Sequence, residues 1–193
     1  MSIDQQKSEL GGNKYFVCVV RGWDEQGNSY LLSAGTDNNL EAVQERLNKT
    51  YFNHKVDLCL ADNVGFNNTD DLDKFVRDNA RVYYYKGTSF KNTNGRAFVP
   101  SENVKKLFHC DALRYQVKLL DLMYSPRRTD GYGWYLPVTV DDTYFQQICN
   151  VKPNTRMSKD SNGFIYANWA AFGGARRDYF DCEKMCLAAL EIA

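Results

Sequence analysis

One stretch decides how this chain begins to fold: Lys14-Tyr15-Phe16-Val17-Cys18-Val19-Val20-Arg21-Gly22-Trp23. Its alternation around a β-branched run predicts a strand. Turn-forming residues follow at Asp24-Glu25-Gln26-Gly27-Asn28, and Ser29 to Ala34 then reads as a returning strand. The three segments together predict a β-hairpin as the first unit of a sheet.

Beyond the hairpin, helical and extended patterns alternate. A helix is predicted over 38–51, where apolar residues recur at helical spacing and Asn38 and Glu41 can form a capping box. The longest helix is expected over 102–124, and its two apolar stripes indicate that it packs from two sides. The remaining expectations are strands at 55–61, 81–86, 134–140 and 164–169, helices from about 70, over 141–150 and from about 174, and a polar loop over 151–162.

This order of elements predicts an α+β fold with a mixed, mostly antiparallel sheet and about five helices. The 193 residues suffice for a buried core without disulfide or metal staples. We expect a single domain over 14–193. Residues 1–13 are polar and lack the apolar segment of a secretory signal, so they are predicted to be a flexible N-terminal tail.

The charge of the chain is balanced overall and uneven locally. Lys and Arg number 24, as do Asp and Glu; residues 81–124 hold 8 basic against 3 acidic residues, and residues 1–80 hold 8 against 13. A protein that binds polyanions in bulk is usually basic throughout, so any anionic contact is expected to be local. No apolar stretch is long enough to span a bilayer, which predicts a cytoplasmic protein without membrane contact.

Neither the cysteines nor the acidic residues form a known metal motif. The six cysteines include no Cys-x-x-Cys pair, and the only histidines are His54 and His109, so free thiols are favoured over a zinc site. Asp57 and Asp62, with three aspartates over 70–73, raise the question of a divalent ion. Their spacing matches no calcium loop, and helix capping explains the last three. No metal, cofactor or catalytic residue is therefore predicted.

Two segments, 83–96 and 125–137, combine cations, glycine and large aromatic rings, a mixture typical of contact surfaces. They predict a binding protein, an adaptor or inhibitor of a macromolecular partner with acidic groups, rather than an enzyme. The prediction requires Trp134 and its neighbours to be accessible. The candidate binding residues are Tyr83, Tyr85, Lys86, Lys91, Arg96, Arg127, Arg128, Tyr132, Trp134 and Tyr135.

The same residues leave a nucleic-acid alternative open. Tyr83 and Tyr85 share one face of a strand, and with the following cations they could form a stacking platform for a single-stranded nucleic acid. The zero net charge ranks this below a protein partner. Arg176 and Arg177 follow Gly173-Gly174, where an anion could approach the start of the last helix, although a flexible turn is the simpler interpretation.

Two short strings resemble another family. Tyr85-Lys86-Gly87-Thr88-Ser89 and Gly131-Tyr132-Gly133-Trp134-Tyr135-Leu136 resemble two NAD-holding segments of the poly(ADP-ribose) polymerase-like transferases. Lys86 stands where that family has His, and Trp134 where it has Ile. The resemblance implies an NAD-consuming ADP-ribosyltransferase as an alternative function.

Overall fold

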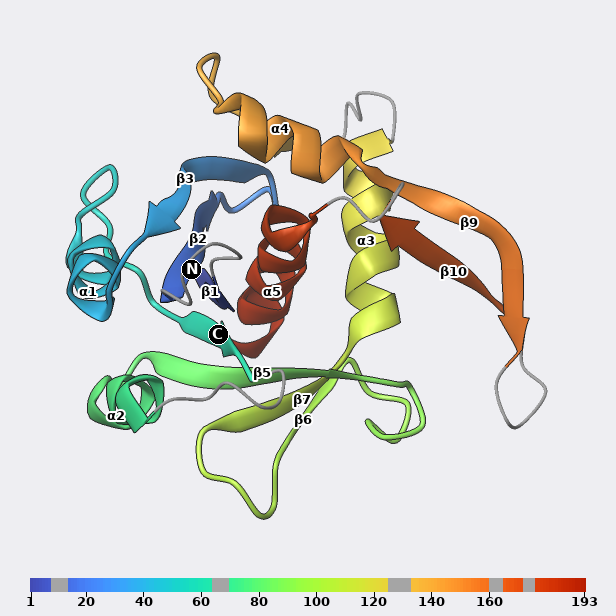
Figure 1. The fold of residues 1–193 in the computed structure, drawn as a ribbon, viewed down its shortest axis with the longest axis horizontal. Coiled ribbons are helices and arrows are strands. Elements are labelled where there is room, and N and C mark those ends of the chain that lie inside the picture. The colour runs from blue at the N-terminus through green and yellow to red at the C-terminus, as the bar shows by residue number, and fades with distance from the viewer. Residues whose placement is uncertain (8–13, 64–69, 125–132, 160–164, 172–175) are drawn as a thin grey trace.

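The computed structural model describes residues 1–7, 14–63, 70–124, 133–159, 165–171 and 176–193 (Figure 1). Its strands are β1 (Ser2–Lys7), β2 (Lys14–Trp23), β3 (Ser29–Asp37), β4 (Cys59–Asp62), β5 (Val82–Thr88), β6 (Phe98–Pro100), β7 (Leu107–Asp111), β8 (Trp134–Tyr135), β9 (Val151–Lys159) and β10 (Ile165–Ala171). Its helices are α1 (Leu40–Asn48), α2 (Asp70–Asp78), α3 (Ala112–Tyr124), α4 (Asp142–Cys149) and α5 (Asp178–Ile192). No described helix is both long and apolar enough to cross a membrane.

Eight strands form one sheet in the order β6-β7-β5-β4-β1-β2-β3-β8, and β9 and β10 form a separate hairpin. The predicted α+β class, mixed sheet and five helices are confirmed for the described residues. The predicted antiparallel majority is wrong: four of the seven pairings in the large sheet, β1–β4, β4–β5, β5–β7 and β3–β8, are parallel. Parallel neighbours need crossover connections, and α2 supplies one between β4 and β5.

The predicted β2–β3 hairpin is present, and its turn shows why the sequence specifies it. Gly27 has φ +81°, a left-handed conformation that glycine adopts without steric cost. Its amide donates to the Asp24 carbonyl at 3.0 Å, and the Asp24 carboxylate accepts from the Asn28 amide at 2.8 Å. The hairpin is therefore closed by local chemistry alone.

The prediction of a flexible tail fails for Ser2–Lys7, which form β1 in the interior of the sheet. This strand pairs antiparallel with β2 and parallel with β4. Ser2 is 0% and Ile3 1% exposed, so a largely polar segment is buried by its two neighbours. Sheet pairing of this kind depends on distant partners, which composition does not reveal.

The long helix predicted over 102–124 begins only at Ala112, because Leu107–Asp111 instead form β7. β7 lies between β5 and β6, so its backbone groups are hydrogen-bonded on both sides. Lys106, immediately before it, has φ +58°, which no helix accommodates. The loop predicted over 151–162 is also wrong, since Val151–Lys159 form β9.

Helices cover both faces of the large sheet, and each face has its own apolar cluster. α1 and α2 contribute Val43, Leu47, Leu72, Phe75 and Val76 to one cluster. α3, α4 and α5 pack into the other, beneath which lie alternate residues of the central strands. Figure 1 shows α5 lying against β1 and β2, which places its first turn over the middle of the sheet.

Candidate active site

Two aspartates lie on neighbouring parallel strands and face the same helix. Asp4 lies in β1, and Asp62 ends β4. The Ser2 hydroxyl accepts a hydrogen bond from the Cys186 thiol of α5 at 3.3 Å, so alternation along β1 turns Asp4 toward that helix as well. Leu60 packs into the cluster beneath α5 and orients Asp62 in the same way. The two carboxylates therefore lie on the α5 face.

The first turn of α5 adds Asp178 and Asp181, and the four carboxylates repel one another. Asp4 is 8% exposed, and its pKa is raised to about 8. Burial is the largest cause, followed by the negative charges of Asp62, Asp178 and Asp181. Repulsion between clustered carboxylates favours the protonated form of one of them, and it also makes the cluster attractive to cations.

Three cations near the start of α5 partly neutralise the cluster. Arg176 donates from Nε to Oδ2 of Asp178 at 2.9 Å, and Arg177 lies 3.2 Å from Asp181. Lys184 pairs with Asp181 as well. The pKa of Asp178 is nevertheless raised, mainly by burial, while Arg176 acts to lower it. Both carboxylates in the first turn of α5 are thus engaged in ion pairs with basic side chains.

The four carboxylates are suitable ligands for a hard divalent cation, although they do not converge on one point in the structure. In the described part of the chain, no three His, Cys, Asp or Glu side chains already enclose a position for a metal ion. Asp178 and Asp181 point to their basic partners, and Asp4 accepts from Nε2 of Gln6 at 2.8 Å. Carboxylate oxygens are the ligands that Mg²⁺ and Mn²⁺ prefer, and Mg²⁺ commonly takes one or two of them and keeps several waters.

Comparison with protein families places the chain in a known group. The family model described as terminase large subunit gpA, endonuclease domain, matches residues 1–193. The chain belongs to this family. No curated protein and no solved structure shows a match.

Membership of the terminase endonuclease family corrects the functional prediction from sequence. The adaptor or inhibitor interpretation is wrong, as are the ADP-ribosyltransferase and the single-stranded nucleic-acid-binding alternatives. The ranking of partners is corrected too, because an endonuclease acts on a nucleic acid. The aromatic and Arg-rich loops are prominent in the sequence, whereas the aspartates are isolated there and only the fold brings them close.

The terminase endonuclease fold separates the two segments that were predicted to form one binding face. Tyr83, Tyr85 and Lys86 lie in β5, and Lys91 and Arg96 lie in the loop that follows it. Trp134 and Tyr135 form β8, and β4, β1, β2 and β3 lie between β5 and β8. Five strand spacings amount to about 24 Å. Arg127, Arg128 and Tyr132 lie outside the described residues.

Trp134 and Tyr135 have structural contacts on the edge strand. The guanidinium of Arg21 lies 4.4 Å from the centre of the Trp134 ring, and Arg21 is itself paired with buried Glu183. Trp134 is partly buried against the cluster beneath α5. Tyr135 stacks on Tyr30 with ring centres 5.1 Å apart. The accessibility that the docking prediction required of Trp134 is therefore only partial.

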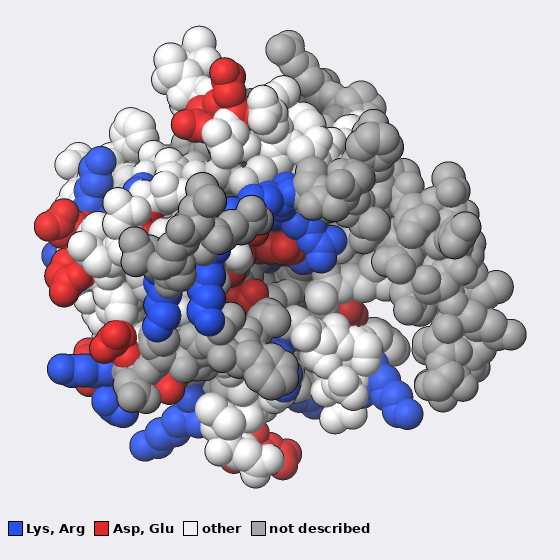
Figure 2. All heavy atoms as spheres, viewed as in Figure 1, with Lys and Arg blue, Asp and Glu red and all other residues white. Residues whose placement is uncertain are grey.

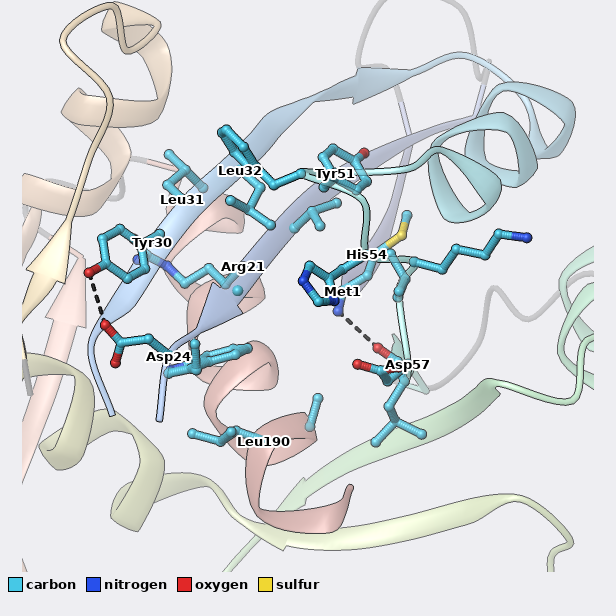
Figure 3. A pocket seen from close by; sticks show the side chains of 18 of the residues that line it. Met1, Arg21, Asp24, Tyr30, Leu31, Leu32, Tyr51, His54, Asp57 and Leu190 are labelled. Carbon is cyan, nitrogen blue, oxygen red and sulfur yellow. Dashed lines mark hydrogen bonds between the residues drawn. The ribbon is translucent and has the colours of Figure 1, made fainter. Parts of the chain in front are cut away.

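A cavity of about 640 Å³, lined by Arg21, Asp24 and Tyr30 among others, lies away from the four carboxylates. Figure 3 shows Tyr30 directed at Asp24 on one wall, with Met1 and His54 on the other. Leu190, near the end of α5, also lines this cavity, whereas the acidic residues surround the beginning of that helix. Asp24 is half-buried, and its pKa is lowered by hydrogen bonds, first from Asn28. The cavity therefore lacks the clustered charge of the acidic site.

Sequence reasoning considered Asp62 as an ion ligand and set it aside, and it missed Asp4, Asp178 and Asp181. The spacing Asp178-x-x-Asp181 at the start of a helix places two carboxylates on one helix face, which is a usable signal. No sequence signal marks Asp4 as a ligand. Asp4 comes close to Asp62 only because β1 pairs with β4, which lies more than fifty residues away in the sequence. Arg176 and Arg177 were correctly placed at the start of the last helix.

Proposed function

We propose that this chain is a divalent-metal-dependent DNA endonuclease domain that hydrolyses phosphodiester bonds beside Asp4 and Asp62. One observation carries the proposal: the charges of Asp62, Asp178 and Asp181 act on buried Asp4 and raise its pKa, in a chain of the terminase endonuclease family. The terminase description supports DNA as the nucleic acid. The all-carboxylate donor set supports magnesium or manganese over zinc.

The carboxylates supply the charge that this chemistry needs. Divalent ions at such a site lower the pKa of a bound water and offset the negative charge of the phosphate under attack. Asp4 and Asp62 come from strands of a packed sheet, so their positions are fixed by backbone hydrogen bonds. Asp4, with a pKa of about 8, releases its proton when the site gains positive charge.

Basic residues at the start of α5 are suited to the DNA backbone. Arg176 is exposed, and both it and Arg177 precede a fifteen-residue helix whose N-terminus favours phosphate. Arginine holds phosphate oxygens in a forked geometry. In this proposal the two arginines release Asp178 and Asp181, which then bind the metal ion. The arginines pair with DNA phosphates instead of with the carboxylates.

The loop after β5 offers a second contact with DNA. Lys86, Lys91 and Arg96 are exposed at the carboxyl end of β5, beside the strand that Asp62 ends. The loop is held by turns, including the hydrogen bond from the Gly95 amide to the Phe90 carbonyl at 3.1 Å. Figure 1 shows this loop and the β9–β10 hairpin projecting toward the same side of the view. Figure 2 shows basic and acidic groups interspersed, which supports local rather than broad phosphate contact.

Plasmid nicking with a matched pair of variants tests the proposal. Asp62→Asn and Asp57→Asn alter aspartates five positions apart near the two ends of β4, and Asp57 is exposed. With Mg²⁺ or Mn²⁺, the wild type and Asp57→Asn should nick supercoiled DNA. Asp62→Asn should lose more than about 100-fold of the rate, since even removing a partner of a metal ligand costs 10- to 100-fold. Wild-type cleavage by Asp62→Asn, or cleavage that persists in a chelator, would contradict the proposal.

A further inference from the structure

Tyr85 lies beside Asp62 in the sheet and faces the same side. The two residues are register partners on the parallel strands β5 and β4, so their side chains project from the same face. The Asn63 amide donates to the Tyr85 carbonyl at 2.8 Å, which fixes the strands together at this point. Tyr85 is 5% exposed. Its ring therefore lies in the apolar cluster on the face of the sheet that α5 covers, the face to which the carboxylates also project.

The hydroxyl of this ring has no hydrogen-bond partner among the described residues. Buried hydroxyls nearly always have one, so an exception in a folded protein needs an explanation. Other tyrosines of this chain follow the rule: Tyr115 donates to Glu191 at 3.0 Å and Tyr144 to Glu183 at 2.6 Å. A phenylalanine would fill the place of Tyr85 equally well without a stranded donor.

The ring leans toward the carboxyl end of β5, the end of the sheet at which Asp62 lies. A methyl group placed on Gly87 would lie 3.4 Å from the Tyr85 hydroxyl oxygen, so the hydroxyl sits over a residue two positions further along β5. This direction leads past the end of β4, where Asp62 stands, and toward Ala112 at the start of α3. The pKa of Tyr85 is raised, by burial above all and then by the charges of Cys110, Asp62 and Asp181. The group thus remains a neutral donor near acceptors.

We propose that Tyr85 is a positioning residue of the nuclease site, whose hydroxyl donates a hydrogen bond to the Asp62 carboxylate when Asp62 ligates a divalent ion. The inference rests on the proposed function. A carboxylate has more acceptor positions than one ion uses, and a donor held by a buried ring selects which oxygen faces the ion. In this proposal Asp62 moves into reach of the Tyr85 hydroxyl when it binds the ion, and the buried donor then gains its partner.

Removing only the hydroxyl tests the inference. Mn²⁺ binding to Tyr85→Phe should be weakened by about 10- to 100-fold in isothermal titration calorimetry, the usual effect of losing the partner of a metal ligand. Without metal, the melting temperature should be unchanged or higher, because no hydrogen bond is lost. In plasmid nicking at saturating DNA, kcat should fall while the KM for DNA is retained.

Tyr115→Phe is the matched control, since it removes the hydroxyl of another buried tyrosine that is bonded to Glu191, far along α5. It should lower the melting temperature and leave Mn²⁺ affinity unaltered. The inference is overturned if Tyr85→Phe binds Mn²⁺ as tightly as the wild type while Asp62→Asn does not, or if only the KM for DNA changes. Failure of the wild type itself to bind Mn²⁺ would instead remove the proposed function together with this inference.

Discussion

Arg176 and Asp178 hold each other at the start of α5, with Nε 2.9 Å from Oδ2. The same arginine also donates to Oε1 of Gln6 at 3.4 Å, and Gln6 in turn donates to Asp4. A cation thus bridges a helix carboxylate and the partner of a strand carboxylate. This contact competes with any metal ion for Asp178, and the proposed function requires that it be released.

Replacing Arg176 should therefore move metal and DNA affinity in opposite directions. In Arg176→Gln, Asp178 is free to ligate, and Mn²⁺ binding measured by calorimetry should tighten severalfold. Binding of a short DNA duplex in Ca²⁺, measured by fluorescence anisotropy, should weaken because one phosphate contact is lost. Arg77→Gln, an exposed arginine of α2 that pairs with Asp78, should change neither quantity. A loss of metal affinity in Arg176→Gln would show that Arg176 supports the site instead of blocking it.

The protonation of Asp4 makes a prediction about stability and pH. Its pKa is 3.8 in an unfolded chain and about 8 in the folded protein, so the folded state binds more protons between these values. The stabilisation is complete below pH 3.8 and is lost as the pH rises toward 8. In a chelator, the free energy of unfolding should fall by up to about 1.4 kcal/mol per pH unit within this window.

Urea unfolding of Asp4→Asn at several pH values checks this assignment. The amide cannot ionise, so the variant should show a flatter pH dependence than the wild type. Asp24→Asn is the matched control, because hydrogen bonds lower the pKa of Asp24, whereas the pKa of Asp4 is raised. It should retain the wild-type slope. An equal slope in Asp4→Asn and the wild type would mean that Asp4 is ionised in the free protein.

The loop after β5 gives a prediction about salt dependence. If Lys91 and Arg96 contact phosphates, changing each to Gln should reduce the slope of log affinity against log salt by about 1. Lys55→Gln should leave the slope unchanged, because Lys55 lines the cavity at the opposite end of the sheet. The measurement is duplex binding in Ca²⁺ over a range of salt concentrations. Unchanged slopes in both loop variants would place the DNA elsewhere.

The elements that could be predicted from sequence are those specified by local chemistry. The β2–β3 hairpin follows from its turn, where Gly27 takes a positive φ. α1 follows from its apolar spacing, although its N-cap is Asn39, which accepts from the Ala42 amide at 2.9 Å, and not Asn38 as predicted. Two neighbouring asparagines offer the same cap, and propensity does not choose between them.

The elements and residues that were missed depend on pairing across the fold. Leu107–Asp111 has a helical apolar pattern, yet it becomes β7 because β5 and β6 satisfy its backbone on both sides. Asp4 looks like one polar residue in a polar segment until β4 brings Asp62 beside it. Lys86, Lys91 and Arg96 stand out in the sequence by their charge and aromatic neighbours, and the fold places them at the carboxyl end of β5, the strand beside β4. Single charged residues could therefore be selected from the sequence, but which of them lie close together could not be predicted.

The buried ion pair of Arg21 and Glu183 predicts a stability role for the β8 edge. Glu183 is 0% and Arg21 5% exposed, and Tyr144 and Ser29 complete the hydrogen bonds. Glu183→Ala would leave a buried unpaired guanidinium beside Trp134, a loss of about 3–5 kcal/mol in such pairs. Urea unfolding measures it, with Trp fluorescence as the signal. A loss below about 1 kcal/mol, typical of surface pairs, would show that the pair is open to water.

Gly87 provides a way to restrict the Tyr85 hydroxyl without removing it. A methyl group there would lie 3.3 Å from Cβ of Ala112, which must give by a few tenths of an ångström, and would touch the hydroxyl oxygen at 3.4 Å. If Tyr85 positions Asp62, Gly87→Ala should weaken Mn²⁺ binding in the wild-type background. It should add nothing once Tyr85→Phe has removed the hydroxyl, because the two changes then act on one interaction.

Calorimetry on the two single variants and the double variant closes this cycle, with circular dichroism to establish that each is folded. Non-additive losses in Mn²⁺ affinity are the expected result. Additive losses would mean that Gly87 affects the ion through another route, such as the register of β5 against β7, and the Tyr85 hydroxyl would then have no part in holding Asp62.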